Sequence, residues 1–269
     1  MLDRIHPPQI SIPSLIEIQE PQKLFLKNGT PIYNICVGTQ EVVKIELIFA
    51  AGNIASNSSL IATATNDLME EGSAKHNSSE IAEALDFYGA YLHAENGPDW
   101  SSISLFSLNK FVSETLPYFQ EIITQPLYPA KEIQTYKQQG KQRLSVNLTK
   151  VDYLARINFS QSLFGQDHAY GRVTSLEEYD LLDSKALVDY HEKKYKNGLR
   201  AVVISGLANE QLVQKIINTI DSMDLKNGSL PTIPLNSYVP AKNLSKKKML
   251  FNPQLELVGE HLLDTIPIS

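Results

Sequence analysis

The stretch that decides the fold is Val43-Lys-Ile-Glu-Leu-Ile-Phe49, which ends at Ala50-Ala-Gly52. Every second residue from Val43 to Phe49 is large and apolar. Because successive side chains of an extended strand point to opposite faces, this alternation puts all four apolar side chains on one face. The stretch therefore predicts a β-strand that is half buried against a hydrophobic core.

Further strands are expected on both sides of this stretch. A hairpin precedes it, with strands at 23–27 and 31–37 joined by Asn28-Gly29, a dipeptide that favours tight turns. Downstream, residues 91–95 and 100–108 are expected to be strands joined by a turn at Asn96-Gly-Pro-Asp99. A last strand is expected at 199–205.

Helical patterns lie between these strands. Residues 59–71 have helical spacing and stop at Gly72, a residue typical of helix C-terminal ends. Asn77-Ser-Ser-Glu80 has the pattern of a capping box and opens a helix that places Ile81, Leu85 and Tyr88 on one face. Further helices are expected at 110–124, 131–147, 152–164, 184–195 and 209–221.

The order of these elements predicts the fold class and the domains. Strands gathered with helix pairs between them, rather than strict strand–helix alternation, indicate an α+β fold with a mainly antiparallel sheet packed by helices. From Asp224 the sequence becomes rich in proline among polar residues, which is typical of a linker. We expect an extended arm at 1–22, one domain at 23–222, a linker at 223–246 and a stub of a second half at 247–269.

The composition excludes several classes of protein. The net charge of −6 argues against a nucleic-acid-binding protein, because such proteins need a basic face. A single cysteine, Cys36, allows no disulfide framework within the chain. No stretch approaches the roughly 18 apolar residues of a membrane span, and the N-terminus has no apolar core of a signal peptide. A cytoplasmic location is expected, and a periplasmic one is also compatible.

Six short strings, in this order and at these spacings, resemble the zinc peptidases of the insulinase and mitochondrial-processing-peptidase family. The resemblance covers residues 23–221 and implies an insulinase-type domain that is the first of two homologous halves. The strings are LKNGTPIY at 26–33, KIELIFAAG at 44–52, EGS at 71–73, SEIAEALDFYGA at 79–90, FGQDHAYG at 164–171 and AVVISG at 201–206.

The family's zinc motif is degenerate in this sequence. Active members carry H-x-x-E-H on the helix before the Glu-Gly-Ser string, where two histidines bind Zn²⁺ and the glutamate is the general base. Counting back from Gly72, these positions hold Thr63, Asn66 and Asp67. A hydroxyl and an amide are poor zinc ligands, and an amide cannot take a proton from water.

The third zinc ligand of the family comes from a later helix, and it is also missing. Around residues 138–143, where the family has a carboxylate, this sequence has none. We therefore expect no catalytic residue, no metal ligand and no cofactor in this chain, with zinc only in a catalytic partner.

Three functions are compatible with these observations. The first is a non-catalytic subunit that helps to enclose a peptide substrate, together with a zinc-bearing insulinase-family subunit or by self-association. Its candidate peptide contacts are His93, Ala94 and Glu95, on the strand that matches the family's substrate cleft. The second is an active zinc peptidase with an unorthodox site made of Asp67, His93 and Glu95. The third is a structural scaffold like the family's respiratory-complex subunits.

Overall fold

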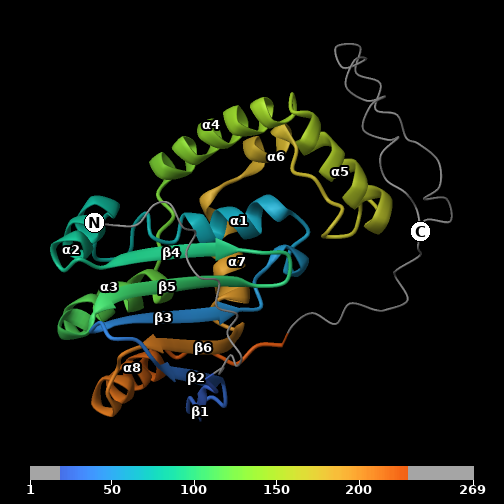
Figure 1. Ribbon diagram of the computed structural model, residues 1–269. Helices are drawn as coiled ribbons and strands as arrows, with labels where there is room; N and C mark the ends of the chain where they lie inside the picture. The colour runs from blue at the N-terminus through green and yellow to red at the C-terminus, as the bar shows by residue number, and fades with distance from the viewer. Residues whose placement is uncertain (1–18, 230–269) are drawn as a thin grey trace, which may run out of the picture.

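The computed structural model describes residues 19–229, and the predicted stub and most of the predicted arm and linker lie outside them. One six-stranded sheet runs through the described part (Figure 1), in the order β1-β2-β6-β3-β5-β4. Only β2 and β6 pair in parallel, so the predicted α+β fold with a mainly antiparallel sheet is confirmed. The strands are β1 (Gln22–Phe25), β2 (Pro31–Cys36), β3 (Val42–Phe49), β4 (Tyr91–Asn96), β5 (Ser101–Leu108) and β6 (Leu199–Gly206).

Strand β3 lies inside the sheet, between β5 and β6. Its four alternating apolar side chains are at most 1% exposed, as the sequence predicts. On its other face Lys44, Glu46 and Ile48 are only half buried. The sheet thus has one face covered by helices and one open face.

Residues 19–229 form eight α-helices, which cover one face of the sheet and extend beyond its β4 edge (Figure 1). The apolar sides of α3 and α8 pack with β3, β5 and β6 in one large core. Helices α4, α5 and α6 gather beyond the β4 side of the sheet (Figure 1). The helices are α1 (Ser59–Asp67), α2 (Ser78–Phe87), α3 (Val112–Thr124), α4 (Ala130–Asn147), α5 (Val151–Phe164), α6 (Leu176–Leu181), α7 (Ser184–Lys194) and α8 (Glu210–Ser222), with short 3₁₀ turns at Asn53–Ala55 and Asn109–Phe111.

Two helices differ from the sequence prediction. Helix α1 ends at Asp67 rather than at residue 71, and a turn leads from it to Gly72, whose φ is 147°. Helix α6 was not predicted, although Ser175 and Glu178 form a capping box at its start. A six-residue helix is too short for apolar periodicity to reveal it, and the capping pattern was its only signal.

Helix α1 is shared by two hydrophobic cores. Its Ala62 belongs to the large core beneath the sheet. Leu60, Ala64 and Leu68, on and just after the helix, belong to a second, smaller core that also contains Ile133 of α4. Because both sides of α1 are packed, its position relative to the sheet and to α4 is fixed.

The loop between α1 and α2 is held by one buried carboxylate. Glu121 of α3 accepts hydrogen bonds from the Ser73 hydroxyl and the Lys75 backbone N–H, and His76 Nδ1 lies 3.1 Å from both carboxylate oxygens. Burial raises the pKa of Glu121, but these hydrogen bonds outweigh it and hold the pKa below its usual value.

The folded unit continues past the predicted boundary at residue 222. Met223 and Leu225 are buried. The Leu199 N–H donates to the Lys226 carbonyl at 3.0 Å, and the Gly228 N–H donates to the Leu199 carbonyl at 3.0 Å. The first residues of the predicted linker therefore pack against β6. Among residues 19–229, no helix has the length and apolar character needed to cross a membrane.

A buried histidine predicts acid sensitivity. His191 Nε2 lies 2.8 Å from the Ile123 carbonyl and must be the donor, because a carbonyl only accepts. Burial lowers its pKa to about 4 from an ordinary value of 6.5. Between these values only the unfolded chain binds the proton, so lowering the pH favours unfolding. We expect the free energy of unfolding to fall by about 2 kcal/mol from this group between pH 8 and pH 5.

Urea unfolding at the two pH values measures this loss. The control is His191→Gln, whose side-chain amide can still donate to the carbonyl but does not titrate. The variant should lose the pH dependence that comes from this group. An unchanged pH dependence in the variant would assign the acid sensitivity to other residues.

Candidate functional site

The three positions of the degenerate motif lie on α1, which contacts α7 and β4. Asn66 is fully buried. Its side-chain oxygen accepts a hydrogen bond of 2.9 Å from the Tyr195 hydroxyl, and its side-chain nitrogen donates to the Ser102 carbonyl at 3.4 Å. Burial raises the pKa of Tyr195, so this hydroxyl stays protonated and donates. Asn66 is therefore a structural amide that ties α1 to β5 and to the end of α7.

Thr63 is also engaged in structural hydrogen bonds. Its hydroxyl donates to the Ser59 carbonyl at 3.0 Å and accepts from the side-chain nitrogen of Asn96 at 2.9 Å. The same nitrogen of Asn96 donates to the Asn53 side chain at 2.7 Å. Thr63 thus connects the end of β4 to α1.

Asp67 faces α4. Its carboxylate accepts a hydrogen bond of 3.0 Å from the Tyr136 hydroxyl. Burial raises the pKa of Asp67, although the hydrogen bond from Tyr136 and the positive charge of Arg143 pull it down. Burial also raises the pKa of Tyr136, so its hydroxyl keeps its proton and donates to the carboxylate.

Tyr136 and Arg143 were not identified as site residues from the sequence. They are seven residues apart on α4, and two helical turns place them on the same side of the helix, toward Asp67. The sequence prediction considered only the missing carboxylate around residues 138–143 of this helix. The seven-residue spacing of Tyr136 and Arg143 is the sequence feature that could have identified them.

These side chains do not fit a zinc ion. A hydroxyl, a buried amide and a carboxylate bonded to tyrosine are directed toward three different neighbours, whereas zinc needs imidazole, thiolate or carboxylate ligands that converge. Among residues 19–229, no group of three or more His, Cys, Asp and Glu side chains is placed to hold a metal ion. The alternative site of Asp67, His93 and Glu95 is therefore not assembled.

The candidate peptide-contacting residues lie on β4, the outermost strand on its side of the sheet. His93 and Glu95 are exposed, and their partners in the register with β5 are Ser104 and Ser102. Ala94 is half buried and packs against the large core. Within the described part of the chain no strand pairs with the outer edge of β4, so its backbone groups on that edge are available for pairing.

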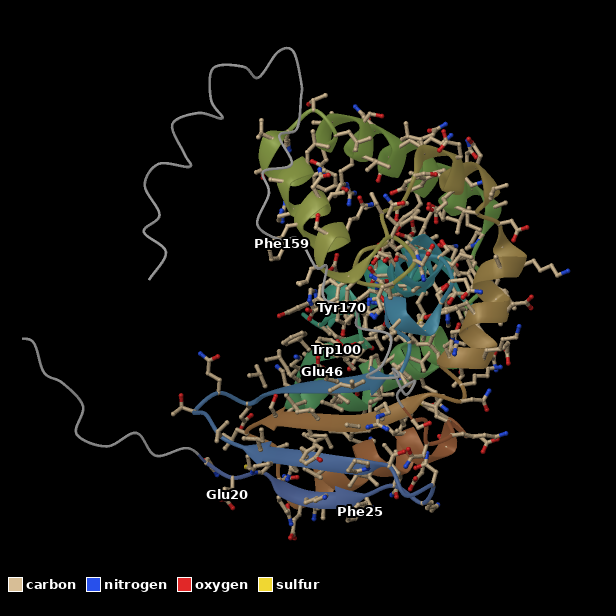
Figure 2. All side chains as sticks on the ribbon, turned by 90° about the vertical axis from the view of Figure 1, so that its right-hand side faces the viewer. Glu20, Phe25, Glu46, Trp100, Phe159 and Tyr170 are labelled. Carbon is tan, nitrogen blue, oxygen red and sulfur yellow. The ribbon has the colours of Figure 1, made fainter. Side chains whose placement is uncertain are left out.

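The open side of the molecule carries aromatic side chains from separate elements. Figure 2 shows Phe159 of α5, Tyr170, Trp100 and Glu46 one below another on the side away from α7 and α8. Phe159 is 64% exposed and Trp100 37% exposed. The Tyr170 hydroxyl donates to Asp99 at 2.5 Å, which raises the pKa of Tyr170 to about 12 and ties the segment after α5 to the β4–β5 turn.

Solved structures share this fold. A peptidase M16 inactive domain from Pseudomonas fluorescens matches with a TM-score of 0.74 and 22% identity, over 80% of this chain and 53% of that one. Pitrilysin matches with a TM-score of 0.66 and 18% identity, over 80% of this chain and 24% of that one. A ferredoxin protease mutant in complex with Arabidopsis ferredoxin matches with a TM-score of 0.66 and 12% identity, over 86% of this chain and 27% of that one.

The predicted insulinase-type fold is therefore confirmed. Identities of this size show a shared fold, and this chain spans about half or less of the length of those proteins. No protein-family model matches the sequence, and no curated protein matches it.

The first prediction from this site concerns stability. Asn66→Ala leaves the buried Tyr195 hydroxyl without its acceptor, so we expect a loss of about 1–3 kcal/mol in the free energy of unfolding. Tyr195→Phe removes the same hydrogen bond from the other side, and the double variant should be less destabilised than the sum of the two single variants. Urea unfolding of all three measures this coupling. Strictly additive losses would show that the two side chains do not act together.

The second prediction concerns metal content. Because the motif positions do not fit zinc, protein purified without chelator should contain well below one zinc per chain. Elemental analysis checks this, with a zinc-bearing insulinase-type peptidase purified in parallel as the control. One tightly held equivalent of zinc would contradict the interpretation of the motif as non-catalytic.

Proposed function

We propose that this chain is a non-catalytic subunit of an insulinase-type peptidase. In this role it binds part of a peptide substrate and helps to enclose it, and cleavage takes place on a zinc-bearing partner subunit. The observation that carries the proposal is the hydrogen bonding of the motif positions, above all the buried Asn66 between Tyr195 and the Ser102 carbonyl.

The free edge of β4 supports the peptide-binding part of this proposal. An extended peptide can add to an unpaired strand through main-chain hydrogen bonds, while its side chains contact the strand's neighbours. His93 and Glu95 are exposed on this strand and remain the proposed contacts. Ala94 contributes through its backbone, because its side chain packs on the core.

The open face of the sheet and the aromatic side chains beside it support association with another chain. Exposed aromatic residues on one side of a protein are typical of interaction surfaces. The preferred partner is a zinc-bearing insulinase-type subunit, since this chain lacks the ligands and the base. Self-association through the same face is the alternative. Location in the cytoplasm stays a prediction.

Reconstitution tests the proposal. Cleavage of a quenched fluorescent peptide is measured with a zinc-bearing insulinase-type chain from the same organism, alone and mixed with this chain. We expect the rate to rise roughly tenfold or more in the mixture, because enclosing the substrate positions it for attack. Glu95→Lys on β4 should remove the stimulation, whereas Glu83→Lys, an exposed position on α2, should not.

Two results of the reconstitution would contradict the proposed role. If this chain forms no complex with the zinc-bearing chain and leaves its rate unchanged, the role as a peptidase subunit is wrong. A stable complex in which the rate still does not change would favour the scaffold function.

A further inference from the structure

A groove lies beside the first residues of β4. It has a volume of about 400 Å³ and is bounded by β4, α2 and the turn that follows α1. Its lining combines apolar and acidic side chains. The apolar lining includes Ile81, Leu85 and Leu92, and the acidic lining consists of Glu70, Glu71 and Asp86.

Within the part of the chain that the structure describes, the three carboxylates of the groove form no ion pair. Among the described residues, neither an ion pair nor a hydrogen bond is formed by the side chains of Glu70, Glu71 or Asp86. Burial raises the pKa of Glu70, and repulsion from Glu71 and Asp67 raises it further. Burial also raises the pKa of Glu71, and the charge of Glu132 adds to this. The groove therefore carries negative charge that the protein itself does not balance.

The other charged groups near the groove do not neutralise its negative charge. Within residues 19–229, His93 on β4 lowers the pKa of Glu70, but this effect is smaller than the effects of burial and of the neighbouring carboxylates that raise it. The positive end of α2 is adjacent, but the Asn77 side chain and the Glu80 carboxylate already cap it. Negative charge therefore dominates the groove.

The edge of the groove also presents an aromatic ring. Tyr91 lines the groove, is 55% exposed and stacks on Phe106, with ring centroids 4.4 Å apart. A cation over the face of an aromatic ring is attracted to it. Carboxylates and an apolar floor suit a cation on an apolar stem, and the ring of Tyr91 lies at the rim, on the open face of the sheet.

We infer that this groove binds the side chain of an arginine or lysine from a peptide strand docked on β4. The inference rests on the proposed function, because the peptide is placed by the β4 edge next to the groove. The methylene stem of such a side chain would cover the apolar floor, and its charged group would meet the carboxylates. Arginine suits the groove better than lysine, since its planar guanidinium can bond two carboxylates at once.

A pair of matched peptides tests this inference. The probes are two fluorescein-labelled heptapeptides of threonine and valine, one with a central arginine and one with citrulline, its uncharged isostere. Dissociation constants for the full chain come from fluorescence anisotropy at pH 7.5. We expect the arginine peptide to bind about tenfold more tightly, as is typical of a hydrogen-bonded charge pair.

Variants locate the effect in the groove. Glu70→Gln/Glu71→Gln should reduce the arginine peptide to the affinity of the citrulline peptide and leave the citrulline peptide unchanged. Glu83→Gln, which removes an exposed carboxylate of α2 outside the groove, should keep the tenfold difference. Removing unpaired, partly buried charges should not unfold the chain, and a urea unfolding curve of the double variant checks this.

The outcomes separate the two proposals. Equal affinities of the two peptides for the unmodified chain would overturn the groove as a basic side-chain site and leave peptide binding at β4 intact. A tenfold preference that persists in the double variant would also overturn it. Binding of neither peptide would overturn both this inference and the proposed peptide-binding function.

Discussion

The structure depends on the burial of α1 between two hydrophobic cores. The helix supplies Ala62 to the core beneath the sheet and Leu60 and Ala64 to the smaller core shared with α4. A helix packed on both sides cannot rotate or slide without opening one of the cores. Its three polar positions are therefore held in fixed directions. Thr63 is bonded to the end of β4, Asn66 to the end of α7, and Asp67 to helix α4.

This arrangement gives the three polar positions of α1 structural roles. A general base needs a carboxylate that reaches water, but Asn66 is fully buried and bonded on both atoms of its amide. A metal needs converging ligands, but the hydroxyl of Thr63 and the carboxylate of Asp67 are used elsewhere. The edge of β4 and the acidic groove beside it are accessible on this side of the molecule, and these are the surfaces at which we propose that a polypeptide binds.

The fold was predictable because its signals are local. The alternation in β3, the Asn28-Gly29 turn and the Asn77–Glu80 capping box each act within a few residues, and all three appear in the structure as expected. Helix α6 was not predicted from the sequence, because a helix of about one and a half turns is too short to show apolar periodicity. The packing of residues 223–228 on β6 was not predicted, because it depends on hydrogen bonds and burial that form only in the tertiary structure.

The candidate site was predictable only in part. Its positions on α1 followed from spacing, but the sequence does not reveal that Asn66 points into the core or that Tyr136 of α4 meets Asp67. The acidic groove joins the turn after α1 to α2 and β4, so its carboxylates are brought together by tertiary structure and share no motif.

The central claim is that β4 binds peptide within an assembly whose chemistry belongs to another chain. Hydrogen–deuterium exchange tests it most directly, by comparing this chain alone with the chain mixed with a zinc-bearing insulinase-type subunit and an uncleavable peptide. The account predicts that backbone amides of residues 91–96 exchange more slowly in the mixture, because the outer edge of β4 becomes paired. Unchanged exchange across β4 in a mixture shown to contain the complex would contradict it.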